Sequence, residues 1–427
     1  MLQKMRQLLI ISMVLLVAGC TGRSQKVGTG QQEDAEPVVI TDRNGRIVEP
    51  TDSTVLGEII GEAEVDIGKS MTLTIDYELQ QLGQALMEGK RGAVVALEPS
   101  TGEVLCMVSS STDSLYPMLN RCVSASYTSG SVFKAAQALV LLSEGIISPE
   151  TLYPCERGFG HHEFRVGCHA HVSPLALSEA LSQACNGYFC QGFLSMMSDK
   201  RYGDVQGAMT MWKDYMSSLG FGYKLGIDLQ HENRGFIPNA DYYDGVFHHQ
   251  WDGSSIVNIA IGQGEVTATP LQLANLSAII ANRGHYFIPH VVKEIQGAKI
   301  DSIYTTLRQT KVNRDACDAV INGLHMSAIR GTCRDLSTLP IEACGISGTA
   351  ISRGYDHSTF IGFAPMDHPK IAVAVYVENG GWGAKYGVPI GGLVMEQFLN
   401  GALSEASKDK AEQIRQENIS YETEDSN

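Results

Sequence analysis

The chain has 427 residues, of which 44% are hydrophobic and 19% are charged, and its 47 acidic and 32 basic side chains give a net charge of -15. This length allows one large domain with appendages, or up to about three smaller domains, and is ample for a buried core. The acidic balance argues against neutralisation of a phosphate backbone, so nucleic acid is not an expected partner. The composition also excludes collagen, coiled-coil and disordered proteins.

The first twenty residues have the order of a secretory signal peptide. Two basic residues precede an apolar run over residues 8–17, which is too short to span a bilayer. The segment VAGC ends at Cys20 and resembles a bacterial lipobox, whereas an ordinary cleaved signal with an incidental cysteine is the alternative. We therefore expect residues 1–20 to be a lipoprotein signal peptide and Cys20 to be lipidated. The mature chain would be anchored to a bacterial membrane, facing the periplasm or the cell exterior.

The nine remaining cysteines are an odd number, so at least one thiol is unpaired. Cys155 and Cys168 bracket one loop, and Cys333 and Cys344 bracket another, which makes each pair a candidate disulfide. Zinc is an alternative at the first loop, because four histidines lie in or just after it: His161, His162, His169 and His171. The spacing matches no tight Cys-x-x-Cys pattern, so we predict a Cys155–Cys168 disulfide and no metal or other cofactor.

Hydrophobic periodicity and turn residues outline the rest of the chain. Residues 21–70 are predicted to form a tether and a short N-terminal β segment. Helices are predicted over residues 77–89, 131–145, 175–193 and 269–284. Strands are predicted over residues 92–99, 103–110, 358–365 and 370–378, with a short turn in each pair. This order favours an α+β fold, and the charged residues 405–427 are predicted to be a disordered tail.

The sharpest local feature is the segment Gly130-Ser131-Val132-Phe133-Lys134 at the start of a predicted helix. Positions three apart share a helix face, so the Ser131 hydroxyl and the Lys134 amine can come within hydrogen-bond distance. A lysine whose pKa is lowered by burial can remove the hydroxyl proton, and backbone amides at a helix start can stabilise an oxyanion. The alternative is an N-capping serine followed by a surface lysine.

Several longer segments accompany this motif. In chain order they are LTIDYELQ, GAVVALEPSTGEVLCMVS, YTSGSVFK, IGQGEVTATPLQLANLSAIIANRG and HSTFIGFAPMDHPKIAVAVYVENGG. Together they resemble the transpeptidase domain of penicillin-binding proteins, in a class B-like lipoprotein form, and the resemblance covers residues 71–404. It implies an antiparallel sheet flanked by helices, with a helical subdomain beside it. No glycosyltransferase-like segment accompanies it, so we do not expect a bifunctional enzyme.

The resemblance also implies the roles of single residues. Ser131 matches the acylated nucleophile and Lys134 its general base. The second motif of the family, Ser-x-Asn, is matched by residues 184–186, where Asn186 is present but Ala184 replaces the serine. That replacement removes a hydroxyl that would relay a proton to the leaving group.

The third motif of the family, Lys-Thr/Ser-Gly-Thr, is matched by residues 346–349. Ser347 keeps a hydroxyl for a substrate carboxylate, Gly348 permits close approach of the ligand, and the Thr349 amide would complete the oxyanion hole with that of Ser131. Ile346 replaces the lysine and carries no charge. Loss of one charge-assisted hydrogen bond in a desolvated site costs about 1.5 to 3 kcal/mol.

The resemblance implies a serine D,D-transpeptidase or carboxypeptidase that acts on peptidoglycan stem peptides through an acyl-serine and binds β-lactams. No metal or organic cofactor is expected to take part. The two departures, Ala184 and Ile346, motivate a second hypothesis, in which the chain is a degenerate envelope scaffold or a β-lactam sensor. In either case, cell-envelope proteins are candidate partners.

Overall fold

The computed structural model describes residues 39–49, 57, 69–112, 119–161, 164–296 and 298–421. The predicted signal peptide, Cys20 and most of the predicted tether lie outside this part of the chain. The described residues belong to one compact unit, Val38–Asn427. None of the helices they form is both long enough and apolar enough to cross a bilayer.

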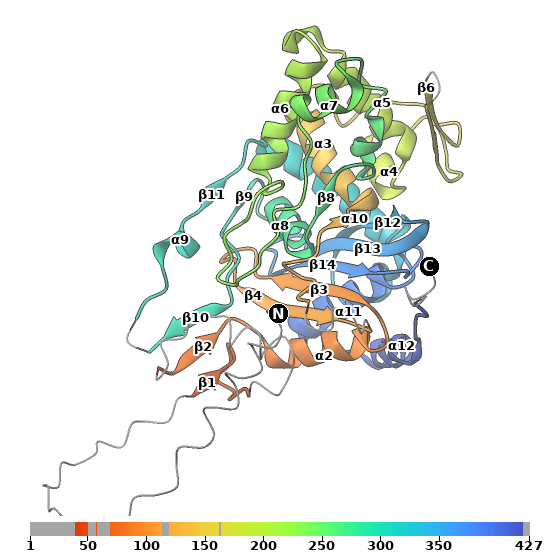
Figure 1. Ribbon diagram of the computed structural model, residues 1–427. Coiled ribbons are helices and arrows are strands. Elements are labelled where there is room, and N and C mark those ends of the chain that lie inside the picture. Colours follow the sequence, from red (N-terminus) through yellow and green to blue (C-terminus); the bar gives the residue numbers. More distant parts are fainter. Residues whose placement is uncertain are drawn as a thin grey trace, which may run out of the picture. The chain divides into compact units, whose positions relative to one another are not determined.

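A five-stranded antiparallel sheet lies at the centre of this unit, with the strand order β12-β13-β14-β3-β4 (Figure 1). Its strands are β3 (Gly92–Leu97), β4 (Val104–Ser110), β12 (Cys344–Ser352), β13 (Tyr355–Ala364) and β14 (Ile371–Val377). The two predicted hairpins are therefore confirmed. They meet where β14 pairs with β3, which leaves β12 as an edge strand.

Alternate residues of the sheet point into two separate apolar clusters, as the two-residue period of a strand requires. In β14, Ala372 and Ala374 contribute to one cluster, together with helix α8 (Pro270–Ala281). Val373 and Val375 contribute to the other, which includes helices α2 (Tyr77–Met87) and α11 (Gly387–Asn400). The sheet is thus covered by helices on both faces, and the predicted α+β class is confirmed.

A group of helices continues the α8 side of the sheet and is drawn above it in Figure 1. It contains α3 (Lys134–Ser143), α4 (Leu177–Ser182), α5 (Asn186–Met197), α6 (Val205–Ser218), α7 (Ala240–Phe247) and α10 (Arg314–Arg330). The 3-10 helices among the described residues are η1 (Gly130–Phe133), η2 (Lys200–Tyr202), η3 (Val257–Ile261) and η4 (Arg334–Thr338), and α9 (Ser302–Thr305) is a single turn.

Four small sheets complete the described elements. Strands β1 (Ile40–Thr41), β2 (Met71–Leu73) and β10 (Val292–Ile295) form one of them. The others are the pairs β5 (Tyr127–Thr128) with β8 (Thr267–Ala268), β6 (Gly158–His161) with β7 (Phe164–Gly167), and β9 (His285–Tyr286) with β11 (Arg308–Gln309). The β5–β8 pair ends two residues before Gly130 and so leads the chain into η1.

The helix predicted over residues 175–193 is broken in the structure. Helix α4 ends at Ser182 and α5 begins at Asn186, and between them Ala184 has a φ of 48°. A left-handed residue interrupts the helical hydrogen-bond pattern, and alanine gives no signal in the sequence that it will adopt this conformation. The break places the segment 184–186 where its backbone can face α3.

The tail predicted to be disordered from residue 405 is ordered at least to residue 421. Helix α12 (Glu405–Gln416) docks through Ile414, which is 2% exposed and whose carbonyl accepts a 2.6 Å hydrogen bond from the Lys90 Nζ. Beyond the helix, the Tyr421 hydroxyl donates to the Glu378 carbonyl at 3.0 Å. The prediction failed because this charged segment is held by a few anchoring contacts rather than by a continuous apolar stripe.

Candidate active site

Ser131 lies in the 3-10 turn η1, directly before helix α3. Gly130 has a φ of 65°, and its amide donates to the Gly262 carbonyl at 2.8 Å. A side chain at position 130 would lie 2.9 Å from the backbone of β12, at the Ala350 nitrogen and the Thr349 oxygen. Glycine is therefore needed here, because the turn must both reverse the chain and pass close to the edge strand.

Lys134 is the first residue of α3, and its side chain is fully buried although lysine is normally charged. Its Nζ donates to the Ser131 Oγ at 2.7 Å, to the Ala184 carbonyl at 2.6 Å and to the Asn186 Oδ1 at 2.5 Å. These three acceptors satisfy all the protons of an ammonium group. The structure thus brings together Ser131, Lys134 and Asn186, as the sequence analysis predicted.

Burial lowers the pKa of Lys134 from its ordinary value of 10.5 to about 8, and this effect outweighs that of the nearby cysteine side chains, which raise it. A lysine with a pKa near 8 is in part a free amine at neutral pH, and only the free amine can take a proton from a hydroxyl. The contact with the Ser131 Oγ is the geometry that such a transfer needs.

Asn186 is the first residue of α5, and its side chain is held from two sides. The Oδ1 accepts from Lys134, whereas the Nδ2 donates to the Gly167 carbonyl at the end of β7 at 2.7 Å. Cys185 caps the helix, since its Sγ accepts from the Tyr188 amide at 3.4 Å. The short hairpin β6–β7 and the start of α5 are therefore tied to each other beside Lys134.

Gly348 brings the edge strand β12 against Ser131. A Cβ at this position would lie 2.9 Å from the Ser131 amide nitrogen and 3.0 Å from that of Val132. It would also lie 2.4 Å from the Thr359 Oγ1 on the neighbouring strand β13. Any larger residue would cover the Ser131 amide, which an oxyanion must reach if it is to be stabilised there.

Thr349 follows on the same strand, where it pairs with Ser358. Its carbonyl accepts a 3.2 Å hydrogen bond from the Gln263 side chain, in the turn that also contains Gly262. The Gly-Gln-Gly segment belongs to one of the family-like segments, but the sequence analysis gave Gln263 no role in the site, because such a segment carries little information on its own. The contact shows that this turn holds both sides of the site, through Gly130 on one side and Thr349 on the other.

The remaining third-motif residues form an apolar and enclosed part of the site. Ile346 is 0% exposed and belongs to the same apolar cluster as the residues of α3. Ser347 is 6% exposed, and its hydroxyl and backbone lie within hydrogen-bond distance of the Cys333 thiol. No charged group is present at position 346, and the Ser347 hydroxyl already has a neighbour in the folded chain.

Three cysteines and one histidine form a cluster directly behind Asn186. The Sγ atoms of Cys155, Cys168 and Cys185 and a ring nitrogen of His171 all lie within 4.8 Å of one another. We call these four residues the Cys–His cluster. The Cys168 Sγ is 3.4 Å from the His171 Nε2 and also accepts from the Asn186 amide at 3.4 Å. The loop after β7 is thereby joined to the segment 184–186.

The donors of the Cys–His cluster fit a tetrahedral Zn²⁺ site. Three thiolates and one imidazole are a common structural zinc ligand set. The His171 Nδ1 lies 2.8 Å from the Val172 carbonyl, so a proton on Nδ1 leaves the Nε2 lone pair directed at the sulfurs. The Cys155 thiol packs on Gly187, where a Cβ would lie 2.8 Å from its sulfur.

The predicted Cys155–Cys168 disulfide is not formed in the structure, in which both residues are free thiols, as are Cys333 and Cys344. Instead, Cys168 interacts most strongly with Cys185. The hydrogen bond from the Cys185 thiol, followed by one from His169, lowers the pKa of Cys168 well below its ordinary value. The same contact raises the pKa of Cys185. Sequence spacing missed this arrangement because Cys185 lies outside the loop that contains the histidines.

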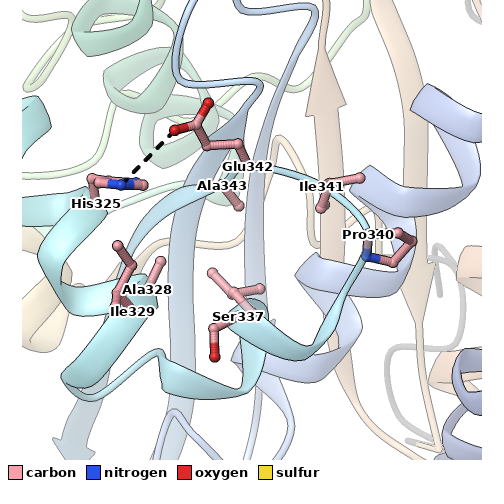
Figure 2. Close-up of a pocket in the computed structure, with 9 residues that line it drawn as sticks. His325, Ala328, Ile329, Ser337, Pro340, Ile341, Glu342 and Ala343 are labelled. Carbon is pink, nitrogen blue, oxygen red and sulfur yellow. Dashed lines mark ion pairs between the residues drawn. The ribbon is translucent and has the colours of Figure 1, made fainter.

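A hollow lies between α10, η4 and the start of β12 and has a volume of about 420 Å³ (Figure 2). It is lined by apolar side chains such as Ile329 and Ile341, and by His325, whose Nε2 lies 3.9 Å from the Glu342 Oε1. None of the residues that line it belongs to the three motifs, so it is separate from the site around Ser131.

The chain matches the family model described as penicillin binding protein transpeptidase domain over residues 92–399. It is 31% identical over 366 residues to the peptidoglycan D,D-transpeptidase MrdA of Acinetobacter baumannii, a match that covers 75% of this chain and 52% of the relative. A further match, to the MrdA protein of Haemophilus influenzae, covers 61% of the relative. The chain thus spans about half to three fifths of the length of these relatives.

Solved structures show the same similarity. Superposition on PBP2 of Pseudomonas aeruginosa in complex with WCK 5153 gives a TM-score of 0.73 at 27% identity, covering 87% of this chain and 98% of that one. A chain in the structure of a peptidoglycan synthase complex gives a TM-score of 0.68 at 28% identity, covering 79% of this chain and 64% of that one.

Proposed function

The chain belongs to the penicillin-binding protein transpeptidase family, and from this premise we propose that it is a serine D,D-transpeptidase or carboxypeptidase acting on peptidoglycan stem peptides. The observation that supports the proposal most is the position of the Lys134 Nζ, which contacts both the Ser131 Oγ and the Asn186 Oδ1. A scaffold has no physical need for a buried lysine that contacts a serine hydroxyl.

In the proposed reaction, the Ser131 Oγ attacks the carbonyl carbon of the penultimate D-alanine, and its proton passes to the free amine of Lys134. The Ser131 and Thr349 amides stabilise the oxyanion of the tetrahedral intermediate. The Lys134 ammonium then returns the proton to the amine of the terminal D-alanine, which leaves as the C–N bond breaks. An acceptor amine or water finally attacks the acyl-serine and releases Ser131.

Because of Ala184 and Ile346, two groups that the family uses are missing from this reaction. With no hydroxyl at position 184 and no cation at position 346, Lys134 must act as both base and acid, and the substrate carboxylate lacks one charged partner. The missing interaction is worth about 1.5 to 3 kcal/mol, which corresponds to about one to two decades in rate or affinity. We therefore expect slow turnover and slow acylation by β-lactams.

A second candidate function follows from the same two residues. Without a hydroxyl at position 184 and a cation at position 346, the site could be acylated and fail to turn over, or could bind stem peptides without reaction. The chain would then be a β-lactam sensor or an envelope scaffold. Ile346 is fully buried and packs into the apolar cluster of the folded chain. This part of the site is therefore a complete piece of core without any substrate, which favours the second candidate.

Release of D-alanine from a pentapeptide that ends in D-Ala-D-Ala separates the two candidates. The purified chain is incubated with the peptide, with and without an acceptor amine, and products are identified by mass. Released D-alanine and a cross-linked product are expected from the wild type and not from Ser131→Ala. Peptide binding with no release, in both proteins alike, would contradict the enzyme and support the scaffold.

We further propose that the chain is held at a bacterial membrane by lipid on Cys20 and works beside other cell-envelope proteins. The lipobox-like segment supports the anchor, and the similarity to a chain of a peptidoglycan synthase complex supports an envelope partner. Metabolic labelling with an alkyne fatty acid tests the anchor. Label is expected on the wild type and should be absent from Cys20→Ala.

The Cys–His cluster is proposed to hold one Zn²⁺ ion that stabilises the segment around Asn186. Its four donor atoms, their mutual distances and the orientation of His171 support this assignment. Elemental analysis of the purified chain should give about one zinc per molecule, and His171→Ala should lose most of it. A protein that contains no transition metal after growth in zinc-supplemented medium would contradict the assignment.

A further inference from the structure

The Cys–His cluster contains three thiols, and two of them meet at the start of α5. The Cys168 Sγ accepts the amide of Asn186, and the Cys185 Sγ accepts the amide of Tyr188 in the same first turn. All the donor atoms of the cluster lie within 4.8 Å of one another. We propose that the cluster is an oxidation site, in which a peroxide joins Cys168 and Cys185 in a disulfide that displaces the metal and slows acylation of Ser131.

The three thiols differ in their access to an oxidant. Cys168 is partly exposed, whereas Cys155 is 5% exposed and Cys185 is 0% exposed. Cys168 is therefore the thiol that a small oxidant reaches first. Cys185 is in hydrogen-bond contact with it and is placed to react with the product. Cys155 is turned toward the Gly158 carbonyl, at 3.7 Å from its sulfur.

Oxidation by hydrogen peroxide proceeds in two balanced steps. The Cys168 sulfur attacks one peroxide oxygen, the O–O bond breaks, and a sulfenic acid and one water are formed. The Cys185 sulfur then attacks the Cys168 sulfur, so that the S–O bond breaks, the S–S bond forms and a second water leaves. Two thiols lose two electrons in total, and the peroxide gains them.

The disulfide and the metal compete for the same sulfur atoms. A disulfide requires the two sulfurs to be about 2.05 Å apart, whereas thiolates around one zinc ion each lie about 2.3 Å from the metal and do not bond to each other. Oxidation therefore removes two of the four ligands and leaves Cys155 and His171, which are too few to hold the ion tightly.

The effect on catalysis follows from the position of Cys185, and this step rests on the proposed function. Cys185 lies between Ala184, whose carbonyl accepts from Lys134, and Asn186, whose Oδ1 accepts from the same amine. Drawing the Cys185 sulfur onto Cys168 shifts this segment. It also converts the Cys168 sulfur, which accepts the Asn186 amide, into a disulfide sulfur, which is a weaker acceptor. A displacement of about 1 Å at a catalytic group lowers rates by up to about 100-fold.

The test treats the purified, reduced, zinc-loaded full chain with stoichiometric hydrogen peroxide and makes three measurements. They are peptide mapping of disulfides, zinc release to a chromogenic chelator, and the rate of labelling by a fluorescent penicillin. We expect a Cys168–Cys185 linked peptide, release of the bound zinc, and a fall of about 10- to 100-fold in the labelling rate. A thiol reductant with added zinc should restore the rate.

Matched variants keep the test decisive. Cys155→Ser retains both reacting thiols and should still form the linked peptide, whereas Cys168→Ser should form none. Cys317→Ala removes a fully buried thiol of α10 and should respond as the wild type does. Circular dichroism checks that each variant is folded before it is treated.

Three outcomes would overturn the inference: no linked peptide, a link between a different pair of cysteines, or an oxidised protein that is labelled at the rate of the reduced one. If the reduced wild type is never labelled by penicillin, it is the proposed function that fails. The linked peptide and the zinc release still decide in that case whether the cluster is an oxidation site.

Discussion

The two sides of the candidate site differ in whether the polar groups of the family's motifs are present. The helical side, formed by η1, α3 and the start of α5, contains a fully satisfied polar constellation in which Lys134 contacts Ser131, Ala184 and Asn186. The strand side, formed by β12, keeps the close approach at Gly348 but has the apolar Ile346 where the family has a lysine. In the proposed reaction, activation of Ser131 and attraction of the substrate carboxylate are thus assigned to separate residues, so that one can be lost without the other.

The largest effect is expected from removing the amine on the helical side. Lys134→Met keeps the length of the side chain but has no base, so labelling of Ser131 by a fluorescent penicillin should fall by at least about 1,000-fold. Lys90 is a second fully buried lysine, which contacts the Ile414 carbonyl, and Lys90→Met is the matched control. Equal labelling of the two variants would show that burial of a lysine, not its position, accounts for the effect.

A smaller loss is expected from the strand side. The Cβ of Gly348→Ala would lie 2.9 Å from the Ser131 amide, so the strand or the nucleophile must shift. We expect penicillin labelling to fall by about 100-fold with the chain still folded. In Gly245→Ala, on α7, the new methyl meets no atom within 4 Å, and labelling should not change. Unchanged labelling of Gly348→Ala would mean that the contact between β12 and Ser131 is not needed.

The serine and the lysine that the family has at positions 184 and 346 can be restored, which would give the strand side its charged partner for the substrate. The double variant Ala184→Ser with Ile346→Lys is expected to label about 10-fold faster than the wild type, since one charge-assisted hydrogen bond is regained. Ile346→Lys alone buries an unpaired charge and should lower the free energy of unfolding by about 3 kcal/mol. Ile346→Met, of similar length and uncharged, controls for packing. A double variant no faster than the wild type would show that the pair is dispensable in this fold.

The pH dependence of labelling should report on the helical side alone. The pKa of Lys134 is lowered to about 8, and only its free amine is a base, so the labelling rate should rise with pH and level off above about pH 8. Stopped-time labelling between pH 6 and 9 measures this profile. A rate that falls as the pH rises from 6 to 8 would contradict the assignment of Lys134 as the base.

Much of the fold was predictable because its signals are local. The helix predicted after Thr269 is confirmed as α8, in which Thr269 and Gln272 form a capping box and Pro270 occupies the first turn. The pairing of Ser131 with Lys134 was predictable for the same reason, since three residues along a helical turn fix their proximity. Patterns of this kind depend only on neighbouring positions in the chain.

The features that were missed depend on contacts between distant segments or on a single backbone angle. The break at Ala184 comes from one left-handed residue, which no periodicity reveals. The Cys–His cluster gathers residues from 155 to 185 that are adjacent only after the β6–β7 hairpin folds onto α5. Cys185 is the signal that could have revealed the cluster, if it had been grouped with the cysteines and histidines of the Cys155 loop instead of being assigned only to a helix.

The central claim is that the helical side alone activates Ser131, and intact mass after incubation with penicillin tests it most directly. We predict that the purified wild-type chain gains the mass of one ring-opened penicillin, that peptide mapping places it on Ser131, and that Ser131→Ala gains none. A folded wild-type protein that gains no mass after prolonged incubation would contradict the account.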